Sequence, residues 1–173
     1  MRVGAMVRAL LLATMGLAAA GVAYADDTSV GCPIRPLDMD VAHVKTTPGV
    51  QSVVVDASGT RATVMFGNGD VLRVATTGCV TPMLSARLWV AGDDAMSDAT
   101  WLQRARSVGE LVLAPASFAQ VSESLKGDVA ITHAEGGMKI ERALADGAGY
   151  SLAVVRTPRD GLGSSLSMVF RHL

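Results

Sequence analysis

Apolar and polar residues alternate over residues 51–76, and this two-residue period limits the possible folds more than any other feature of the chain. Successive side chains of a strand point to opposite faces, so such alternation is typical of strands with one buried face. Ser58-Gly59 and Asn68-Gly69 interrupt it as turn signals. We therefore predict a three-stranded antiparallel meander over about 51–76. Its inward-facing residues are Val53, Val55, Ala62, Val64, Phe66, Leu72 and Val74.

The register of this meander follows from keeping the apolar side chains on one face, because a slip of one residue moves every side chain to the other face. A turn centred on Ser58-Gly59 predicts that Val53 lies opposite Val64. At the second turn, a two-residue loop would place Val64 opposite Arg73. We therefore predict a three-residue loop over 68–70, which places Val64 opposite Val74.

Helical spacing replaces the alternation over about 97–126. Ser97 is a suitable N-cap residue, and Pro115 both ends a first helix and fits the first turn of a second. Gly127 suits the end of the second helix. The predicted apolar stripes are Trp101, Ala105, Val108 and Val112 on the first helix and Phe118, Val121 and Leu125 on the second, with Arg104 and Glu110 facing outward.

The remaining residues, about 128–172, again show the pattern of antiparallel strands separated by glycine-containing turns. Strands, then two helices, then strands are typical of an α+β fold and not of a βαβ nucleotide-binding fold. The predicted strands are about 128–134, 138–145, 149–156 and 164–172, and the inward-facing sets of the last pair are Tyr150, Leu152 and Val154 against Leu166, Met168 and Phe170.

The first 25 residues have the layout of a secretory signal peptide. Two arginines precede an uncharged run over 9–22, and Ala23-Tyr24-Ala25 offers the small residues that a signal peptidase accepts. The uncharged run is shorter than the roughly 20 residues that a membrane-spanning helix needs. We therefore expect cleavage after Ala25, a periplasmic or secreted location, and a single mature domain over 26–173. Its first part, 26–49, is expected to be an extended arm.

Two cysteines, Cys32 and Cys79, remain in the mature chain. In an exported protein an even pair favours a disulfide. A loop of this length would stabilise the fold by about 4 kcal/mol on the chain-entropy model. Lipidation of Cys32 is disfavoured because Ser29 stands where an apolar residue is needed, and the absence of CxxC spacing disfavours a metal site. The disulfide would tie the arm to the end of the meander.

The charge balance gives the chain no electrostatic reason to bind nucleic acid or anionic lipid. The formal net charge is −1, and loss of the two leader arginines would leave 13 basic against 16 acidic residues. We therefore expect a protein partner in the periplasm, no nucleic acid, no cofactor, and no integral membrane segment after the leader is removed.

The sequence contains no strong catalytic motif, since GxSxG, HExxH, the P-loop and GxGxxG are all missing. His43, with Asp38 and Asp40 nearby, is a weak candidate for a general base or ligand in the arm. A solvated loop histidine is the simpler interpretation. We predict no catalytic residues.

Two groups of potential metal ligands occur in the sequence, but neither contains the full set of ligands that a metal site needs. His133 and Glu135 lie two residues apart on one strand face, with no third ligand nearby. Asp93, Asp94 and Asp98 lack the spacing and the distal glutamate of an EF-hand, which favours a solvated loop before the first helix. We predict no metal site.

The segment from Arg156 to Gly163 is the most unusual connection in the sequence, because it is longer than a hairpin needs. Arginine is enriched at interface hot spots, and an exposed leucine can fill a partner's pocket. A flexible hairpin without a function is the alternative. The candidate partner-binding residues are Arg156, Arg159, Asp160 and Leu162.

These observations fit three functions. We favour an exported, non-enzymatic protein that binds another macromolecule, such as an inhibitor or immunity protein against a cell-wall-degrading toxin. The first alternative is an envelope-acting hydrolase that uses His43 and nearby carboxylates. The second is an accessory subunit of an envelope complex, paired through an exposed sheet edge.

Overall fold

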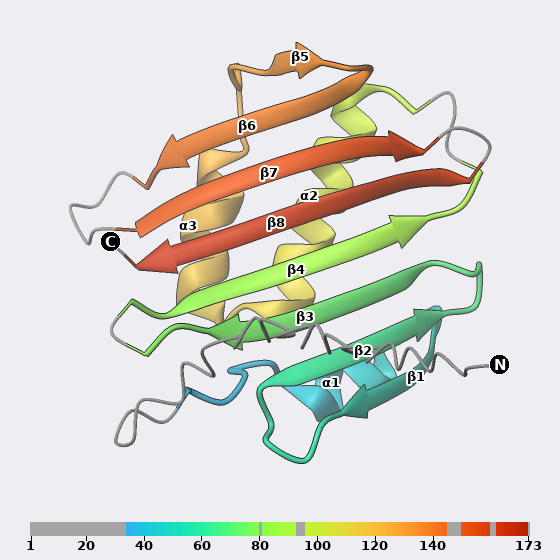
Figure 1. The fold of residues 1–173 in the computed structure, drawn as a ribbon, viewed down its shortest axis with the longest axis vertical. Coiled ribbons are helices and arrows are strands. Elements are labelled where there is room, and N and C mark those ends of the chain that lie inside the picture. The colour runs from blue at the N-terminus through green and yellow to red at the C-terminus, as the bar shows by residue number, and fades with distance from the viewer. Residues whose placement is uncertain (1–33, 80, 93–95, 145–149, 160–161, 173) are drawn as a thin grey trace, which may run out of the picture. The chain divides into compact units, whose positions relative to one another are not determined.

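The α+β arrangement is present in the computed structural model, which describes residues 34–79, 81–92, 96–144, 150–159 and 162–172 (Figure 1). Eight strands form one antiparallel sheet in the order β1-β2-β3-β4-β8-β7-β6-β5. The expected signal peptide, its cleavage site and Cys32 lie outside the described residues. The strands are β1 (Val50–Val55), β2 (Arg61–Phe66), β3 (Val71–Thr77), β4 (Met83–Val90), β5 (Thr132–Ala134), β6 (Gly137–Ala143), β7 (Tyr150–Arg159) and β8 (Gly163–His172).

Two helices, α2 (Asp98–Val112) and α3 (Pro115–Ser124), connect β4 to β5 and lie against one face of the sheet (Figure 1). Both predicted starts are confirmed. The Ser97 side chain accepts a hydrogen bond from the backbone N–H of Thr100, and Pro115 occupies the first turn of α3. The predicted stripes are buried as well, with Trp101, Ala105, Val112, Val121 and Leu125 all 0% exposed.

The even-numbered residues of β2, β3, β4 and β6, together with those of 152–158 in β7 and 164–170 in β8, form the inner face of the sheet, which packs against these helices. The odd-numbered residues form the outer face, which the described helices α2 and α3 leave open (Figure 1). The inner face supplies most of the core: Ala62, Val64, Leu72, Val74, Leu84, Ala86, Leu88, Val90, Met138, Ile140, Leu152, Val154, Leu166, Met168 and Phe170.

The register prediction is confirmed at the first turn and wrong at the second. Val53 pairs with Val64 as expected, but Val64 pairs with Leu72 and not with Val74. The loop has three residues but begins one residue early, over 67–69, because Asp70 stays in the ladder and its carbonyl accepts from Phe66 N–H at 3.0 Å. The partner of Val64 is therefore two residues away from the predicted one. A shift of two residues keeps every side chain on the same face, so the apolar side chains still point to the predicted face.

The arm, expected to be extended, contains a short helix, α1 (Val41–Thr46). The Asp40 carboxylate caps it by accepting from the backbone N–H of His43 at 3.0 Å, and Val44 is completely buried. A single apolar turn is too short to show helical periodicity, which is why the sequence pattern does not reveal it. Hydrogen bonds join the arm to the meander from Leu37 N–H to the Gly59 carbonyl, from Gly67 N–H to the Gly49 carbonyl and from the Thr76 hydroxyl to the Arg35 carbonyl.

Strand β4 is not among the predicted strands, and it is the strand that makes the sheet continuous. It pairs with β3 along one edge and with β8 along the other. Its burial alternates, with Leu84, Ala86, Leu88 and Val90 buried and the residues between them more exposed. The meander therefore has a fourth strand, and the N-terminal and C-terminal strands share one core.

The expected long connection between the last two strands is in fact mostly strand. Strand β7 continues to Arg159, which pairs with Gly163, so the connection is the three residues 160–162. Gly163 has φ +99°, and a side chain there would collide with the Val90 carbonyl. The glycine therefore lets the β8 backbone pass close to the end of β4. Strand β5, in contrast to β7, is shorter than predicted: it covers only Thr132–Ala134 and not 128–134.

Candidate functional site: the arginine face of the sheet

Three neighbouring strands carry an arginine each on the outer face of the sheet. We call Arg61 of β2, Arg73 of β3 and Arg87 of β4, together with the outer surface around them, the arginine face. All three side chains are exposed. Arg73 lies directly opposite Arg87 in the ladder, and Arg61 lies opposite Ala75, diagonal to Arg73. Directly opposed residues have Cβ atoms about 5 Å apart, so Arg73 and Arg87 are close neighbours of like charge.

A hollow of about 360 Å³ lies between these arginines. It exists because the ladder neighbours Ala75 and Ser85 are short, while the residues beside them are long. The Ser85 hydroxyl donates to the Ala75 carbonyl at 3.3 Å, and Arg87 Nε donates to the Ser167 hydroxyl at 3.2 Å. The outward-facing residues that line the hollow are Arg61, Thr63, Arg73, Ala75, Ser85, Arg87, Ser167 and Val169.

Positive charge dominates this face of the described sheet. Further basic side chains at odd-numbered positions are Lys139, Arg159 and Arg171, whereas Glu141 is an acidic one and pairs with Lys139 at 3.0 Å. Among the described residues, no carboxylate forms an ion pair with the three arginines of the arginine face. The outer face of the described sheet is therefore locally basic, although the chain as a whole has a net charge of −1. The arrangement is suited to binding an anionic group.

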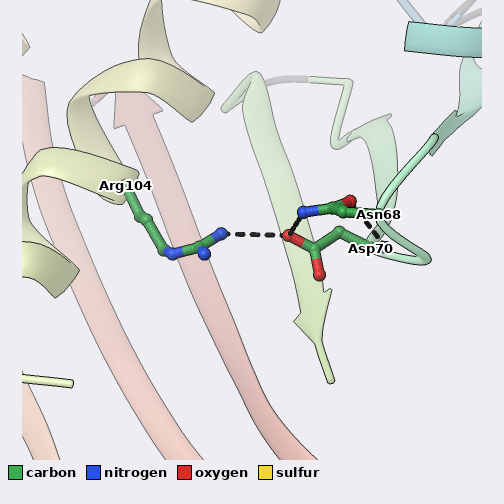
Figure 2. Close-up of polar contacts among 3 residues, drawn as sticks. All are labelled: Asn68, Asp70 and Arg104. Carbon is green, nitrogen blue, oxygen red and sulfur yellow. Dashed lines mark hydrogen bonds and ion pairs between the residues drawn. The ribbon is translucent and has the colours of Figure 1, made fainter. Parts of the chain in front are cut away.

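A second polar cluster lies at the inner side, where α2 meets the β2–β3 turn (Figure 2). Arg104 donates to the Asp70 carboxylate at 3.0 Å, and Asn68 donates to the same oxygen at 3.0 Å. The expectation that Arg104 faces outward is wrong. Its guanidinium reaches the Asp70 carboxylate, which is one of the few buried polar groups of the described chain. The cluster joins two elements of the fold and offers little access to a ligand.

The predicted partner-binding residues are only partly on the surface. Arg156 faces inward, with its guanidinium 5.1 Å from the centroid of the buried Trp101 ring and bonded to Ser164 and the Gly136 carbonyl. Arg159 is exposed, Leu162 is 67% exposed, and Asp160 lies outside the described residues. Arg156 therefore belongs to the interior contacts, while Arg159 and Leu162 stay candidates at the tip of the β7–β8 hairpin.

The histidine candidate of the arm is engaged in local contacts. His43 is exposed on α1, and the Asp40 carboxylate bonds to its backbone N–H, while Asp38 pairs with Arg35 at 3.7 Å. The geometry therefore lends no support to a base at His43.

The two acidic groupings do not assemble a metal site in the described residues. His133 Nε2 lies 3.2 Å from the Asp98 carboxylate, which joins β5 to the start of α2. No group of three potential metal ligands occurs in the described chain. Asp93 and Asp94 lie outside the described residues.

Comparison with family models, with curated proteins and with solved structures finds no match for this chain. None of the described helices has the length and apolarity that a membrane crossing requires.

Sequence reasoning misses the arginine face because it misses β4. Arg61 and Arg73 fall on predicted strands, but the neighbour of Arg73 is unknown without the next strand. A weak signal is present in residues 84–88, where Ser85 and Arg87 alternate with Leu84, Ala86 and Leu88. This alternation places Arg87 at an outward position.

Proposed function

We propose that this protein is an exported, non-enzymatic binding protein that holds an acidic protein partner against its arginine face. The observation that carries the proposal is the pair Arg73 and Arg87, directly opposed on an open sheet face without a carboxylate between them among the described residues. Like charges directly opposite each other destabilise a sheet. A partner's carboxylates would relieve that repulsion on binding.

The overall charge favours a protein over a nucleic acid as the partner. The net charge is −1 before removal of the expected leader and more negative after it, so a long polyanion would be repelled by most of the molecule. A protein can present a few carboxylates locally to the arginine face. Arginine is also enriched at the energetic centres of protein interfaces.

The expected export route narrows the class of partner. A signal peptide and a disulfide would place the protein in the periplasm or outside the cell. Enzymes that degrade cell-wall glycans use paired carboxylates in their clefts, which are acidic surfaces of the required kind. An inhibitor or immunity protein against such a toxin is therefore the specific form of the proposal. The exposed Leu162 at the β7–β8 hairpin tip is available as an apolar anchor.

Capture from the native envelope with charge-reversed variants tests this function. Arg73→Glu would leave a carboxylate opposite Arg87, and Lys45→Glu on α1 makes the same change in net charge elsewhere. The proposal expects a protein that is retained by the wild type and by Lys45→Glu but lost from Arg73→Glu, and whose cell-wall-degrading activity falls on binding. Equal retention by both variants would overturn it, as would capture of nucleic acid alone.

A further inference from the structure

We infer that the hollow of the arginine face is a receptor for carboxylates carried on short aliphatic side chains, which means an acidic peptide segment with at least two neighbouring carboxylates. This inference deepens the proposed function and rests on it for the source of the ligand, a segment of the partner protein. It names the chemical group that is recognised and the residues that recognise it.

The described part of the fold leaves the charge of the three arginines uncompensated. Arg73 and Arg87 lie opposite each other, and Arg61 lies on the diagonal, about 7–8 Å from Arg73 in an antiparallel ladder. No described acidic side chain pairs with any of the three. A carboxylate at this place would interact with two cations at once, and a second carboxylate beside it would be within reach of Arg61.

The Arg87 guanidinium is oriented by a neighbouring side chain before any ligand binds. Its Nε donates to the Ser167 hydroxyl at 3.2 Å, which fixes the direction of the side chain across β8. The described residues provide no ion pair for its terminal nitrogens, so these nitrogens can donate to a ligand. A guanidinium offers two parallel N–H groups that match the two oxygens of a carboxylate, whereas a lysine offers only a point charge.

The lining of the hollow also has an apolar part. Ala75 and Val169 are apolar, and the Ser85 hydroxyl donates to the Ala75 carbonyl, while Thr63 and Ser167 contribute further hydroxyls. The apolar atoms can pack against the methylene groups that precede a side-chain carboxylate, and inorganic phosphate has no such groups. A volume of about 360 Å³ is enough for such a side chain.

The test is titration calorimetry of the purified mature protein at constant ionic strength with three probes: a hexaglutamate peptide, the monocarboxylate butyrate and inorganic phosphate. We expect the peptide to bind at least roughly tenfold more tightly than butyrate, because the peptide presents two neighbouring carboxylates and butyrate only one, and we expect phosphate to bind more weakly than the peptide. Arg87→Lys should weaken peptide binding about tenfold although it keeps the charge. Lys45→Gln, which changes an exposed cation on α1, should leave binding unchanged.

Each other outcome counts against the inference. Phosphate binding as tightly as the peptide would indicate a general anion site, and butyrate binding as tightly as the peptide would indicate that the hollow recognises a single carboxylate. Unchanged binding by Arg87→Lys, with its fold verified by thermal unfolding, would overturn the role of the guanidinium. If the peptide fails to bind while partner capture still depends on Arg73, this inference is wrong and the proposed function stands. If the peptide binds as expected but no protein is captured, the receptor site stands and the proposed function is wrong.

Discussion

Asp70 illustrates how a single buried charge connects two elements of this fold. Its side chain is only 7% exposed, and its carboxylate accepts from Arg104 of α2 and from Asn68 of its own turn (Figure 2). The backbone N–H of Asp70 in turn donates to the Asn68 side chain at 3.1 Å. A buried carboxylate without partners would be costly, so these bonds fix both the β2–β3 turn and the position of α2 against it.

Removal of this charge should destabilise the protein. Asp70→Asn should lower the free energy of unfolding by about 2 kcal/mol, less than for a fully buried pair because the Arg104 side chain is 28% exposed. Urea unfolding of the two single variants, Asp70→Asn and Arg104→Met, and of the double variant measures their coupling. Strictly additive effects would contradict the pairing. Asp38→Asn, which breaks the exposed ion pair with Arg35, is the control and should change stability little.

For individual helices and strands, the local sequence predicts features that depend only on neighbouring residues. It does not predict features that depend on another element far away in the sequence. The helices are predictable because Ser97, Pro115 and the apolar stripes act within a few residues of one another. The ends of β7 and β8 are not, because Gly163 is required by the Val90 carbonyl of β4, far away in the sequence. The arginine face escapes prediction for the same reason, since Arg73 and Arg87 meet only when β3 and β4 pair.

The stability of the β1–β2 hairpin is expected to depend on pH through the Asp56 carboxylate. The Ser58 hydroxyl and the backbone N–H groups of Arg61 and Thr60 all donate to the Asp56 carboxylate, and together they lower the pKa of Asp56 below its ordinary value of 3.8. A carboxyl group with a lower pKa in the folded state stabilises the fold above its unfolded pKa. That contribution is lost as the pH falls through the folded pKa.

Asp56→Asn should therefore reduce stability at pH 7 and flatten the loss of stability below about pH 4. The exchange of the Thr60 and Arg61 amide hydrogens should also become faster, because their acceptor is weaker. Thermal unfolding from pH 7 to pH 2 and hydrogen exchange measure the two effects. Asp128→Asn, at an exposed acidic residue after α3, is the matched control. Parallel pH profiles for wild type and Asp56→Asn would contradict the prediction.

In the molecule as a whole, the two faces of the sheet differ: the inner face packs into the core, and the outer face carries the opposed arginines of the arginine face. The inner face contributes most of the core against α2 and α3, so the outer face can carry opposed arginines whose repulsion the core must offset. Such a division requires a sheet that is continuous and well anchored. Strand β4 gives continuity at the centre, and the arm anchors the meander through Leu37 and Thr76.

The proposed Cys32–Cys79 disulfide would complete that anchoring. Cys79 lies in the described β3–β4 connection, close in sequence to Thr76, whose hydroxyl already holds the arm at the Arg35 carbonyl. The exported protein should therefore be about 2 Da lighter than its reduced form by mass spectrometry.

Cys79→Ser should lower the free energy of unfolding by up to about 4 kcal/mol, because the unfolded chain regains the entropy that the crosslink removes. Cys32→Ser should cost the same, and the double variant no more than either, since each change breaks one shared bond. Additive losses in the double variant, or two alkylatable thiols in the exported protein, would show that the cysteines act separately and that hydrogen bonds alone hold the arm.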